Sequence, residues 1–321
     1  MTGVTVRVPA KLNLQLAVGP PRADGYHDLV TVFHAVSLFD EVTAEPARRD
    51  GVSVSGEGAD RVPADGDNLA LRAVAALRGP PGTGPGVSRA GPGPAGVHIT
   101  IAKRIPVAAG LAGGSGDAAA ALVACNELWA GGFGPPQLAD IAARVGSDVA
   151  FALLGGTAVG RGRGEQLTPA LAPATQYHWV LAFADGHLST PEVYAALDRQ
   201  RARASEQVPA EPGLDPALMS ALRSGDARLV GRTLSNDLQP AALSLLPALR
   251  KTLAAGLELG ALGALVSGSG PTCVFLAASA DRALDLAASL SGAGVCRSVA
   301  RASGPVSGAA IVSGASVTGP R

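Results

Sequence analysis

The stretch KRIPVAAGLAGGSGDAAAALVACNELW, from Lys103 to Trp129, decides how the rest of the chain is interpreted. Its first part holds four glycines between residues 110 and 116, and its second part is an alanine-rich run that favours helix. The first amides of a helix lack intrahelical partners and lie at the positive end of its dipole, so a glycine loop that opens into a helix predicts a phosphate site. These residues alone leave a second interpretation open, in which a glycine-rich turn precedes a buried helix and binds nothing.

Two familiar phosphate motifs are missing from this stretch. It lacks the lysine and the spacing of G-x-x-x-x-G-K-[ST], and it contains no G-x-G-x-x-G. The hydroxyl of Ser115 suits either of two tasks, because it can cap the helix or bind a magnesium ion.

A wider pattern assigns the loop. The segment PVAAGLAGGSGDAA, from Pro106 to Ala119, resembles the P-x-x-x-G-L-G/A-G-G-S-S/A-D/N-A-A motif of the GHMP kinases. The resemblance implies an α+β GHMP kinase fold with two domains, residues 1–165 and 166–321, an active cleft between them and a ferredoxin-like layer in the second. It also implies ATP and Mg²⁺ as cofactors, with Ser115 on the metal. The residues that it assigns to ATP are Pro106, Val107, Ala108, Ala109, Gly110, Leu111, Ala112, Gly113, Gly114, Ser115, Gly116, Asn68 and Lys103.

The composition favours a small-molecule partner. Lysine plus arginine and aspartate plus glutamate number 26 each, so no basic surplus points to nucleic acid. The N-terminus has no signal-peptide pattern and no segment approaches the ~18 apolar residues of a membrane helix, which predicts a cytoplasmic protein without a membrane partner. The three cysteines are scattered in apolar contexts and are expected to be reduced core residues: Cys125, Cys273 and Cys296.

The N-terminal region carries a second motif. Valines and leucines alternate up to residue 18, which predicts strands with Lys11 and Asn13 on one face. A lone lysine on a strand is usually solvated. However, P-A-K-L-N followed by the turn D-G-Y-H (Asp24 to His27) and by T-V-F resembles those GHMP kinases that act on a cytidine diphosphate-linked methylerythritol. That resemblance implies phosphorylation of the 2-hydroxyl of this substrate in isoprenoid precursor biosynthesis. The residues that it assigns to the substrate are Asn13, Tyr26, His27, Thr190 and Tyr194.

A third motif supplies an acid. The segment R-V-G-S-D-V-A-F with the following G-G-T-A resembles the family's G-[SA]-D-V-P-F…G-G-T-A, although Ala150 replaces the usual proline. The resemblance implies that Asp148 takes the proton from the substrate hydroxyl and that Lys11 lies close to it. Without the motif, an acid in the first turn of a helix is ordinarily a dipole-stabilised residue. A fourth motif, from Gly263 to Leu276, resembles the family's third glycine loop, which packs against the phosphate loop.

The remaining elements follow from periodicity and from turn residues. Asp67 is a plausible N-cap for a helix over residues 68–77, and the Gly/Pro-rich segment 79–96 predicts a flexible surface loop. Residues 198–215 are expected to be exposed and mobile. Further helices are predicted over residues 136–145, 148–154, 216–222, 243–257 and 281–290. Further strands are predicted over residues 30–54, 97–101, 177–184 and 295–299.

Three alternatives compete with this interpretation. Another GHMP kinase, acting on homoserine, mevalonate or a sugar, is disfavoured by the D-G-Y-H turn directly after P-A-K-L-N. A non-catalytic nucleotide-binding relative is disfavoured because it would need neither Lys11 nor Asp148. A scaffold without a ligand is disfavoured because four separated motifs match in order.

Overall fold

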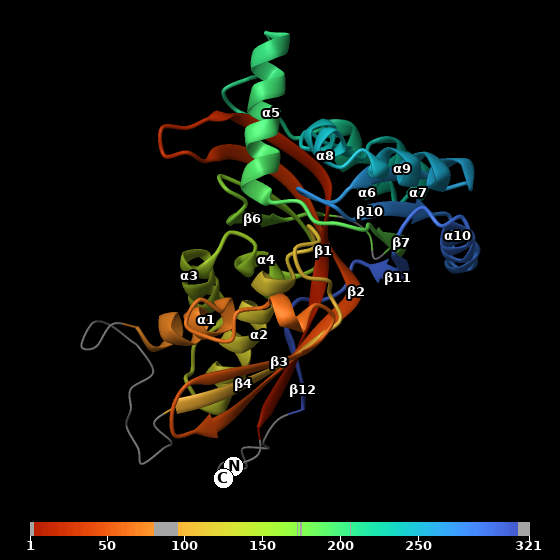
Figure 1. Ribbon diagram of the computed structural model, residues 1–321. Helices are drawn as coiled ribbons and strands as arrows, with labels where there is room; N and C mark the ends of the chain where they lie inside the picture. Colours follow the sequence, from red (N-terminus) through yellow and green to blue (C-terminus); the bar gives the residue numbers. More distant parts are fainter. Residues whose placement is uncertain (1–2, 80–95, 172, 174, 206, 314–321) are drawn as a thin grey trace.

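The computed structural model describes residues 3–79, 96–171, 173, 175–205 and 207–313. Two long strands organise it, β1 (Val4–Pro21) and β2 (His27–Ala47), which pair antiparallel around the predicted turn at Asp24 (Figure 1). The register of this pair shifts between Pro9 and Ala10. Proline cannot donate a ladder hydrogen bond, so the chain forms one irregular strand where the sequence suggested a break between two.

The first sheet grows from these two strands. Its main order is β12-β1-β2-β4-β3; β5 also pairs with β2 and with β6, and β8 pairs with β1. The added strands are β3 (Gly51–Gly56), β4 (Gly96–Lys103), β5 (Thr157–Arg161), β6 (Gln166–Pro169), β8 (Ser235–Asn236) and β12 (Ala310–Ser313).

Four helices pack with this sheet around a shared core of valine, isoleucine, leucine and alanine side chains. They are α1 (Leu69–Arg78), α2 (Gly113–Leu128), α3 (Pro135–Val145) and α4 (Val149–Leu154), and the short 3₁₀ helix η1 (Ala59–Arg61) precedes them. Asn68, not Asp67, is the N-cap of α1, because its side chain accepts a hydrogen bond from the amide of Ala70. Alanine dominates the inner face of α2, which lets that helix lie close to β1 and β2.

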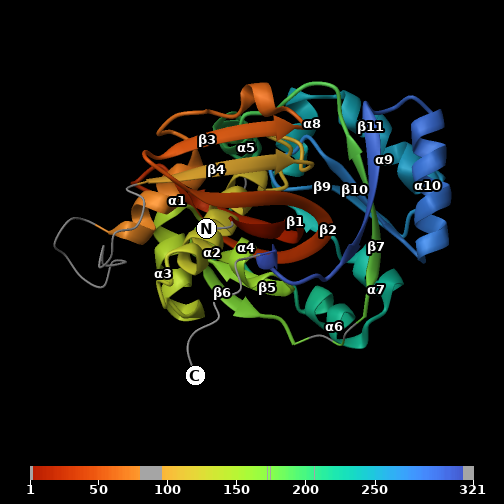
Figure 2. The same cartoon turned by 90° about the horizontal axis from the view of Figure 1, so that it is seen from below.

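A second sheet and its helices form a second layer, which has the ferredoxin-like topology that the resemblance implied. Its four strands, in the order β11-β7-β10-β9, all pair antiparallel. They are β7 (Tyr177–Phe183), β9 (Gly263–Val266), β10 (Cys273–Ala277) and β11 (Ser298–Gly304). The helices are α5 (Thr190–Ala204), α6 (Pro216–Ser224), α7 (Ala227–Arg232), α8 (Gln239–Leu245), α9 (Ala248–Glu258) and α10 (Ala280–Gly292). Figure 2 shows the two sheets beside each other, and one apolar cluster joins them.

Several predicted boundaries differ from the structure. The helix predicted over 243–257 is two helices, because the chain turns at Leu246 and Pro247. Part of the segment predicted to be mobile, 198–204, is the second half of α5. The last predicted strand begins at Ser298 instead of Val295. The domain boundary after residue 165 stays a prediction, and β6, β8 and β12 join the first sheet from beyond it.

Three other expectations concern the surface and the cysteines. The predicted loop 79–96 lies outside the described residues except for its two ends. Within the described part of the chain, no helix combines the length and the apolar character needed to span a bilayer. All three cysteines are free; Cys125 and Cys273 are buried as expected, whereas Cys296 is half-buried. Burial raises the pKa of the Cys125 and Cys273 thiols to about 12.

Candidate active site

The phosphate loop connects β4 to the N-terminus of α2. Its backbone takes left-handed conformations at Ala108, Gly110 and Ala112, with φ angles of 54°, 74° and 57°. The close approach of another loop also excludes any side chain at Gly110, because a Cβ atom there would lie 2.2 Å from the carbonyl oxygen of Ser267. Ser267 also donates a hydrogen bond to the Gly110 carbonyl at 3.1 Å. The third glycine loop therefore packs against the phosphate loop, as expected.

The first turn of α2 carries the amides that were predicted to bind phosphate. Gly113, Gly114 and Ser115 are its first three residues, and Gly114 is exposed. Helix amides at this position have no intrahelical acceptor and favour phosphate oxygens. The half-buried Ser115 belongs to the same turn, so its hydroxyl fits a magnesium ion that is held mainly by ATP phosphates and water. Within the described part of the chain, no cluster of three or more His, Cys, Asp or Glu side chains could hold a metal ion by itself.

The structure brings the predicted lysine and acid together beside this loop. Lys11 lies on β1 and Asp148 is the N-cap of α4, and the Lys11 Nζ lies 4.0 Å from an Asp148 carboxylate oxygen. The same ammonium donates to the Asn13 side-chain oxygen at 2.6 Å and to the Gly110 carbonyl at 3.1 Å. Lys11 is buried, which lowers its pKa, and the charge of Asp148 opposes part of that shift. A lysine and a carboxylate that are far apart in the sequence thus lie together, and the lysine contacts the phosphate loop.

A chain of hydrogen bonds fixes the orientation of Asn13. Its amide nitrogen donates to the Thr31 hydroxyl at 2.8 Å, and that hydroxyl donates to the carbonyl of Gln15 at 2.7 Å. The Asn13 oxygen therefore points at Lys11. Thr190, at the start of α5, shares a 2.9 Å hydrogen bond with Ser269 of the third glycine loop. Sequence reasoning selected Asn13 and Thr190 but did not identify Thr31 or Ser269 as their partners.

The predicted base-binding residues divide into two groups. His27 and Tyr194 are in contact, with ring centroids 5.0 Å apart and planes 38° apart. Burial raises the pKa of the Tyr194 hydroxyl, and the nearby charge of Asp148 raises it further. Tyr26 is 55% exposed, and the Arg163 guanidinium lies 5.2 Å from its ring centre. Tyr194 therefore packs against His27 and lies near Asp148, while Tyr26 lies at the surface.

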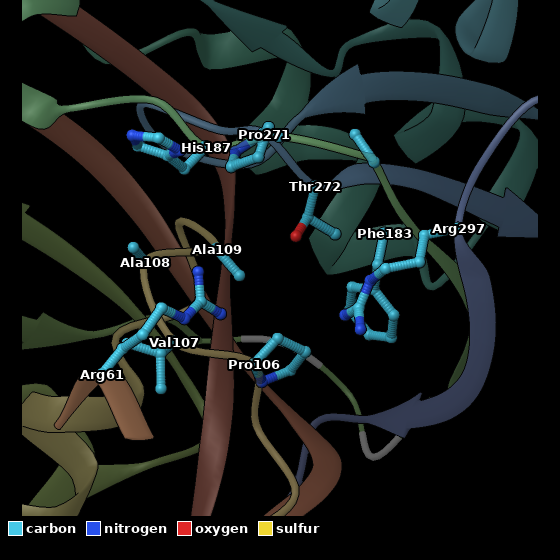
Figure 3. A pocket seen from close by; sticks show the side chains of 12 residues that line it. Arg61, Pro106, Val107, Ala108, Ala109, Phe183, His187, Pro271, Thr272 and Arg297 are labelled. Atoms are coloured by element: carbon cyan, nitrogen blue, oxygen red, sulfur yellow. The ribbon is translucent and has the colours of Figure 1, made fainter. Parts of the chain in front are cut away.

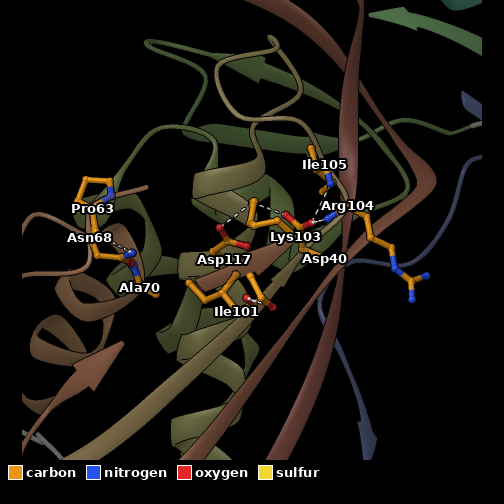
Figure 4. A network of polar contacts seen from close by, with 10 residues as sticks. Asp40, Pro63, Asn68, Ala70, Ile101, Lys103, Arg104, Ile105 and Asp117 are labelled. Atoms are coloured by element: carbon orange, nitrogen blue, oxygen red, sulfur yellow. Dashed lines mark hydrogen bonds and ion pairs between the residues drawn. The ribbon is translucent and has the colours of Figure 1, made fainter. Parts of the chain in front are cut away.

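The structure gives Lys103 a different environment from the one its assignment to ATP implied. Its side chain is 1% exposed and its ammonium bonds to the carboxylates of Asp40 and Asp117, the latter at 2.8 Å (Figure 4). The second oxygen of Asp40 accepts the backbone amides of Arg104 and Ile105 at 2.6 and 2.8 Å. Lys103 thus anchors the start of the phosphate loop to β2 and α2. Its contact with ATP remains a prediction, because two of its three donors are already used by these carboxylates.

The charged groups of this buried cluster shift one another's pKa values. Burial alone would lower the pKa of Lys103, but the two carboxylates outweigh burial and raise it. Burial raises the pKa of Asp117 to about 7 although Lys103 opposes the change. Asp40 lies within a long strand, where the sequence offers no local signal for it. Asp117 was recognised only as one position of the glycine-loop motif, with no role predicted for it.

Asn68 is also occupied within the protein. Besides capping α1, its amide nitrogen donates to the Pro63 carbonyl at 2.7 Å (Figure 4). Its predicted contact with the nucleotide base remains a prediction, and it would compete with these two bonds.

A cavity of about 230 Å³ lies between the phosphate loop and the second layer (Figure 3). Arginine side chains approach it from both layers, and Arg297 donates to Glu57 at 2.7 Å. Its lining residues are Arg61, Pro106, Val107, Ala108, Ala109, Phe183, Ala184, Gly186, His187, Pro271, Thr272 and Arg297. The predicted cleft between the two layers thus borders the loop that was assigned to ATP.

Comparison with known proteins agrees with these motifs. Residues 68–156 match the family model of the GHMP kinases N-terminal domain, and residues 218–296 match that of the GHMP kinases C-terminal domain. A 4-diphosphocytidyl-2-C-methyl-D-erythritol kinase of Thermobifida fusca is 57% identical, with 97% of this chain and 99% of the relative covered. The enzyme of the same name from Mycolicibacterium smegmatis is 56% identical, with 96% and 92% covered.

Solved structures give the same result. A crystal structure of 4-(cytidine 5'-diphospho)-2C-methyl-D-erythritol kinase aligns with a TM-score of 0.70 at 34% identity, covering 93% of this chain and 98% of that one. A homoserine kinase from Cytophaga hutchinsonii aligns with a TM-score of 0.67 at 20% identity over 97% and 98%, which shows a shared fold alone. With both family models matched and identities above 50% over nearly the full length, this chain belongs to the GHMP kinase family.

Proposed function

We propose that this GHMP kinase transfers the γ-phosphate of ATP to the 2-hydroxyl of 4-diphosphocytidyl-2-C-methyl-D-erythritol, a step in isoprenoid precursor biosynthesis. The observation that carries the proposal is the identity of 57% and 56%, over nearly the whole chain, to two kinases named for that substrate. The geometry supports it, because the Lys11–Asp148 pair lies against the phosphate loop.

Phosphoryl transfer requires charge neutralisation along the phosphates and an acceptor hydroxyl held in line. In the proposed mechanism the amides of residues 113–115 bind phosphate oxygens. Asp148 accepts the proton of the attacking hydroxyl, and the Lys11 ammonium stabilises the negative charge that develops on the oxygen. Mg²⁺, held by Ser115 and the phosphates, would supply further neutralisation.

The hydrogen-bond chain through Asn13 supports the role of Lys11. The lysine stem is flexible, and burial lowers the pKa of its ammonium unless acceptors and a counter-charge offset the effect. Asn13 and the Gly110 carbonyl provide two acceptors, and Asp148 provides the counter-charge. Lys11 is therefore held between the acid and the phosphate loop before any substrate arrives.

The substrate side of the proposal uses aromatic and polar groups at one end of this site. Tyr194 would stack on the cytosine ring and His27 would read its edge, with Tyr26 closing over the outer face; stacking of this kind contributes about 1–3 kcal/mol per base. Thr190 and Asn13 would bind the diphosphate-methylerythritol portion.

An acceptor panel tests the proposal. The purified protein, ATP and Mg²⁺ are incubated separately with the cytidine substrate, homoserine, mevalonate and galactose, and ADP formation is followed. We expect turnover with the cytidine substrate alone. Turnover with another acceptor but not with this one would redirect the assignment within the family, and turnover with none would favour a non-catalytic relative.

A further inference from the structure

Asp198 connects the second layer to the predicted base site. It lies on α5, and its carboxylate accepts a 3.0 Å hydrogen bond from the Nε2 of His27, at the start of β2. The imidazole side chain is only 5% exposed, whereas that of Asp198 is 33% exposed. None of the four motifs in the sequence contains Asp198, and the proposed mechanism does not use it.

Asp198 and Tyr194 lie one helical turn apart. Residues separated by four positions share a face of a helix, so both side chains point from α5 toward the β1–β2 hairpin. The Tyr194 ring packs against the His27 ring while Asp198 bonds to its edge. Figure 1 shows α5 beside the hairpin, and the donation from Arg201 to the Gly19 carbonyl is a second link between them. Two groups on one helix face therefore fix both the plane and the rotation of the His27 ring.

The hydrogen bond to Asp198 also selects a tautomer. A carboxylate without a proton only accepts, so Nε2 must carry hydrogen. In a neutral imidazole the other nitrogen, Nδ1, is then an acceptor. Among the residues that the structure describes, Nδ1 has no hydrogen-bond partner. A neutral ring held in this way keeps its free acceptor at Nδ1.

An acceptor distinguishes cytosine from uracil. Cytosine carries an amino group at C4 that donates a hydrogen bond, whereas uracil carries a carbonyl oxygen there that only accepts. An acceptor facing this position bonds to cytosine and is left unpaired and repelled by uracil, which penalises the wrong base.

We propose that Asp198 is a positioning residue that holds His27 in its Nε2-protonated form and so makes the base site selective for a 4-aminopyrimidine over uracil. The proposal rests on the proposed function for the identity of the base. Asp198 acts through His27 and does not itself touch the substrate.

The first experiment compares ligand binding by calorimetry. CDP and UDP are titrated into the parent protein and into the Asp198→Asn, Asp198→Ala and Asp198→Glu variants. The parent should bind CDP roughly ten- to a hundredfold more tightly than UDP, the range for one well-placed polar contact to a base. The Ala variant should show a ratio below about threefold. The Asn variant, whose amide oxygen can still accept from Nε2, and the Glu variant, which keeps a carboxylate, should retain part of the selectivity. Asp140→Asn is the matched control, because Asp140 is exposed on α3.

Steady-state kinetics distinguish a positioning role from a general structural role, because the two change KM and kcat differently. In Asp198→Ala the KM for the cytidine substrate should rise about tenfold, while kcat and the KM for ATP stay within about twofold. A parallel loss in all three parameters would overturn the proposal in favour of a general structural role. An unchanged CDP to UDP ratio in Asp198→Ala would also overturn it.

The second experiment is independent of the substrate. Nitrogen-detected NMR of ¹⁵N-histidine protein at pH 8 reports which ring nitrogen carries the proton, and a His27→Gln variant assigns the signal among the five histidines. We expect the Nε2-protonated neutral form in the parent and a mixture of tautomers in Asp198→Ala. A doubly protonated ring or an Nδ1-protonated ring in the parent would refute the role of Asp198. If instead the tautomers behave as expected but neither CDP nor UDP binds, the proposed function fails and the positioning of His27 stands.

Discussion

Replacing Lys103 by methionine should destabilise the protein more than any single surface change. The substitution keeps most of the side-chain volume but leaves two carboxylates, Asp40 and Asp117, buried at 0% and 4% exposure without their cation. Removing one partner of a buried ion pair costs about 3–5 kcal/mol because the remaining charge is uncompensated. Domains of ordinary stability have only about 5–15 kcal/mol in total. The variant should therefore lose a large part of its free energy of unfolding.

The two carboxylates should respond differently to this change. Asp40 keeps the backbone amides of Arg104 and Ile105, whereas one oxygen of Asp117 has no partner within the described part of the chain. We therefore expect the protonation of Asp117 to relieve part of the cost. The double variant Lys103→Met/Asp117→Asn should recover about 1–2 kcal/mol, as expected when a buried unpaired charge is removed.

The assay is equilibrium urea unfolding of the protein without ligands at pH 8 and at pH 5. A carboxyl group whose pKa is higher in the folded than in the unfolded protein makes the fold less stable as the pH rises above the unfolded pKa. The loss of Lys103 should strengthen this effect at Asp117, so the difference in free energy of unfolding between the parent and Lys103→Met should be larger at pH 8 than at pH 5. Lys251→Met is the control, because Lys251 is exposed on α9 and its loss should change stability by less than about 0.5 kcal/mol. A loss below about 1 kcal/mol for Lys103→Met, at either pH, would refute the reasoning.

Three further predictions address the site and the core. Asp148→Asn should lower kcat at least about a hundredfold with little change in the KM for ATP, because only proton acceptance is lost; turnover near the parent level in a coupled ATP assay would remove Asp148 as the base. His34 has its pKa lowered to about 3 by burial, so it stays neutral in the fold while the unfolded chain gains a proton below pH ~6.5, and stability should fall as pH decreases from about 6.5 to 3. His34→Gln should flatten that slope in acid titrations of unfolding, and parallel curves for the two proteins would contradict the argument. Gly110→Ala should raise the KM for ATP about tenfold or more, because the added Cβ would meet the Ser267 carbonyl. The control is Gly132→Ala, which has a similar φ of 68° and no atom within 4 Å of its Cβ and should bind ATP normally. Equal effects of the two substitutions would show that backbone strain alone is responsible.

The sequence predicted the parts of the site that have a local signal. The glycine run and the alanine-rich helix indicated a candidate phosphate loop, and the resemblance to the GHMP motif favoured it over a plain glycine turn. The contact between Lys11 and Asp148 was different, because no spacing rule brings together residues so far apart and only the resemblance suggested it. The two tyrosines came from the same resemblance and lie in different surroundings, since Tyr194 is near Asp148 whereas Tyr26 is exposed, and their contact with the base stays a prediction.

Partners that are distant in the chain could not be predicted. The sequence offered Lys103 as an ATP ligand and gave no sign of its bond to Asp40, 63 residues away. The same is true of Asp198, whose exposed helix gives no sign that it meets His27. Short strands such as β8 and β12 have too few residues for a period of two to be recognised, so their pairing with β1 could not be predicted.

The position of β12 has a consequence for how the protein is made. β12 pairs with β1 at Thr5 to Arg7, a few residues before Lys11, yet it is translated after nearly all the rest of the described chain. Until residues 310–313 emerge from the ribosome, β1 has an open edge there, and unpaired strand edges invite association with other chains. The strand that bears Lys11 is thus fully paired only after residues 310–313 have been made, and slow docking of this late segment would leave its edge open to association with other chains.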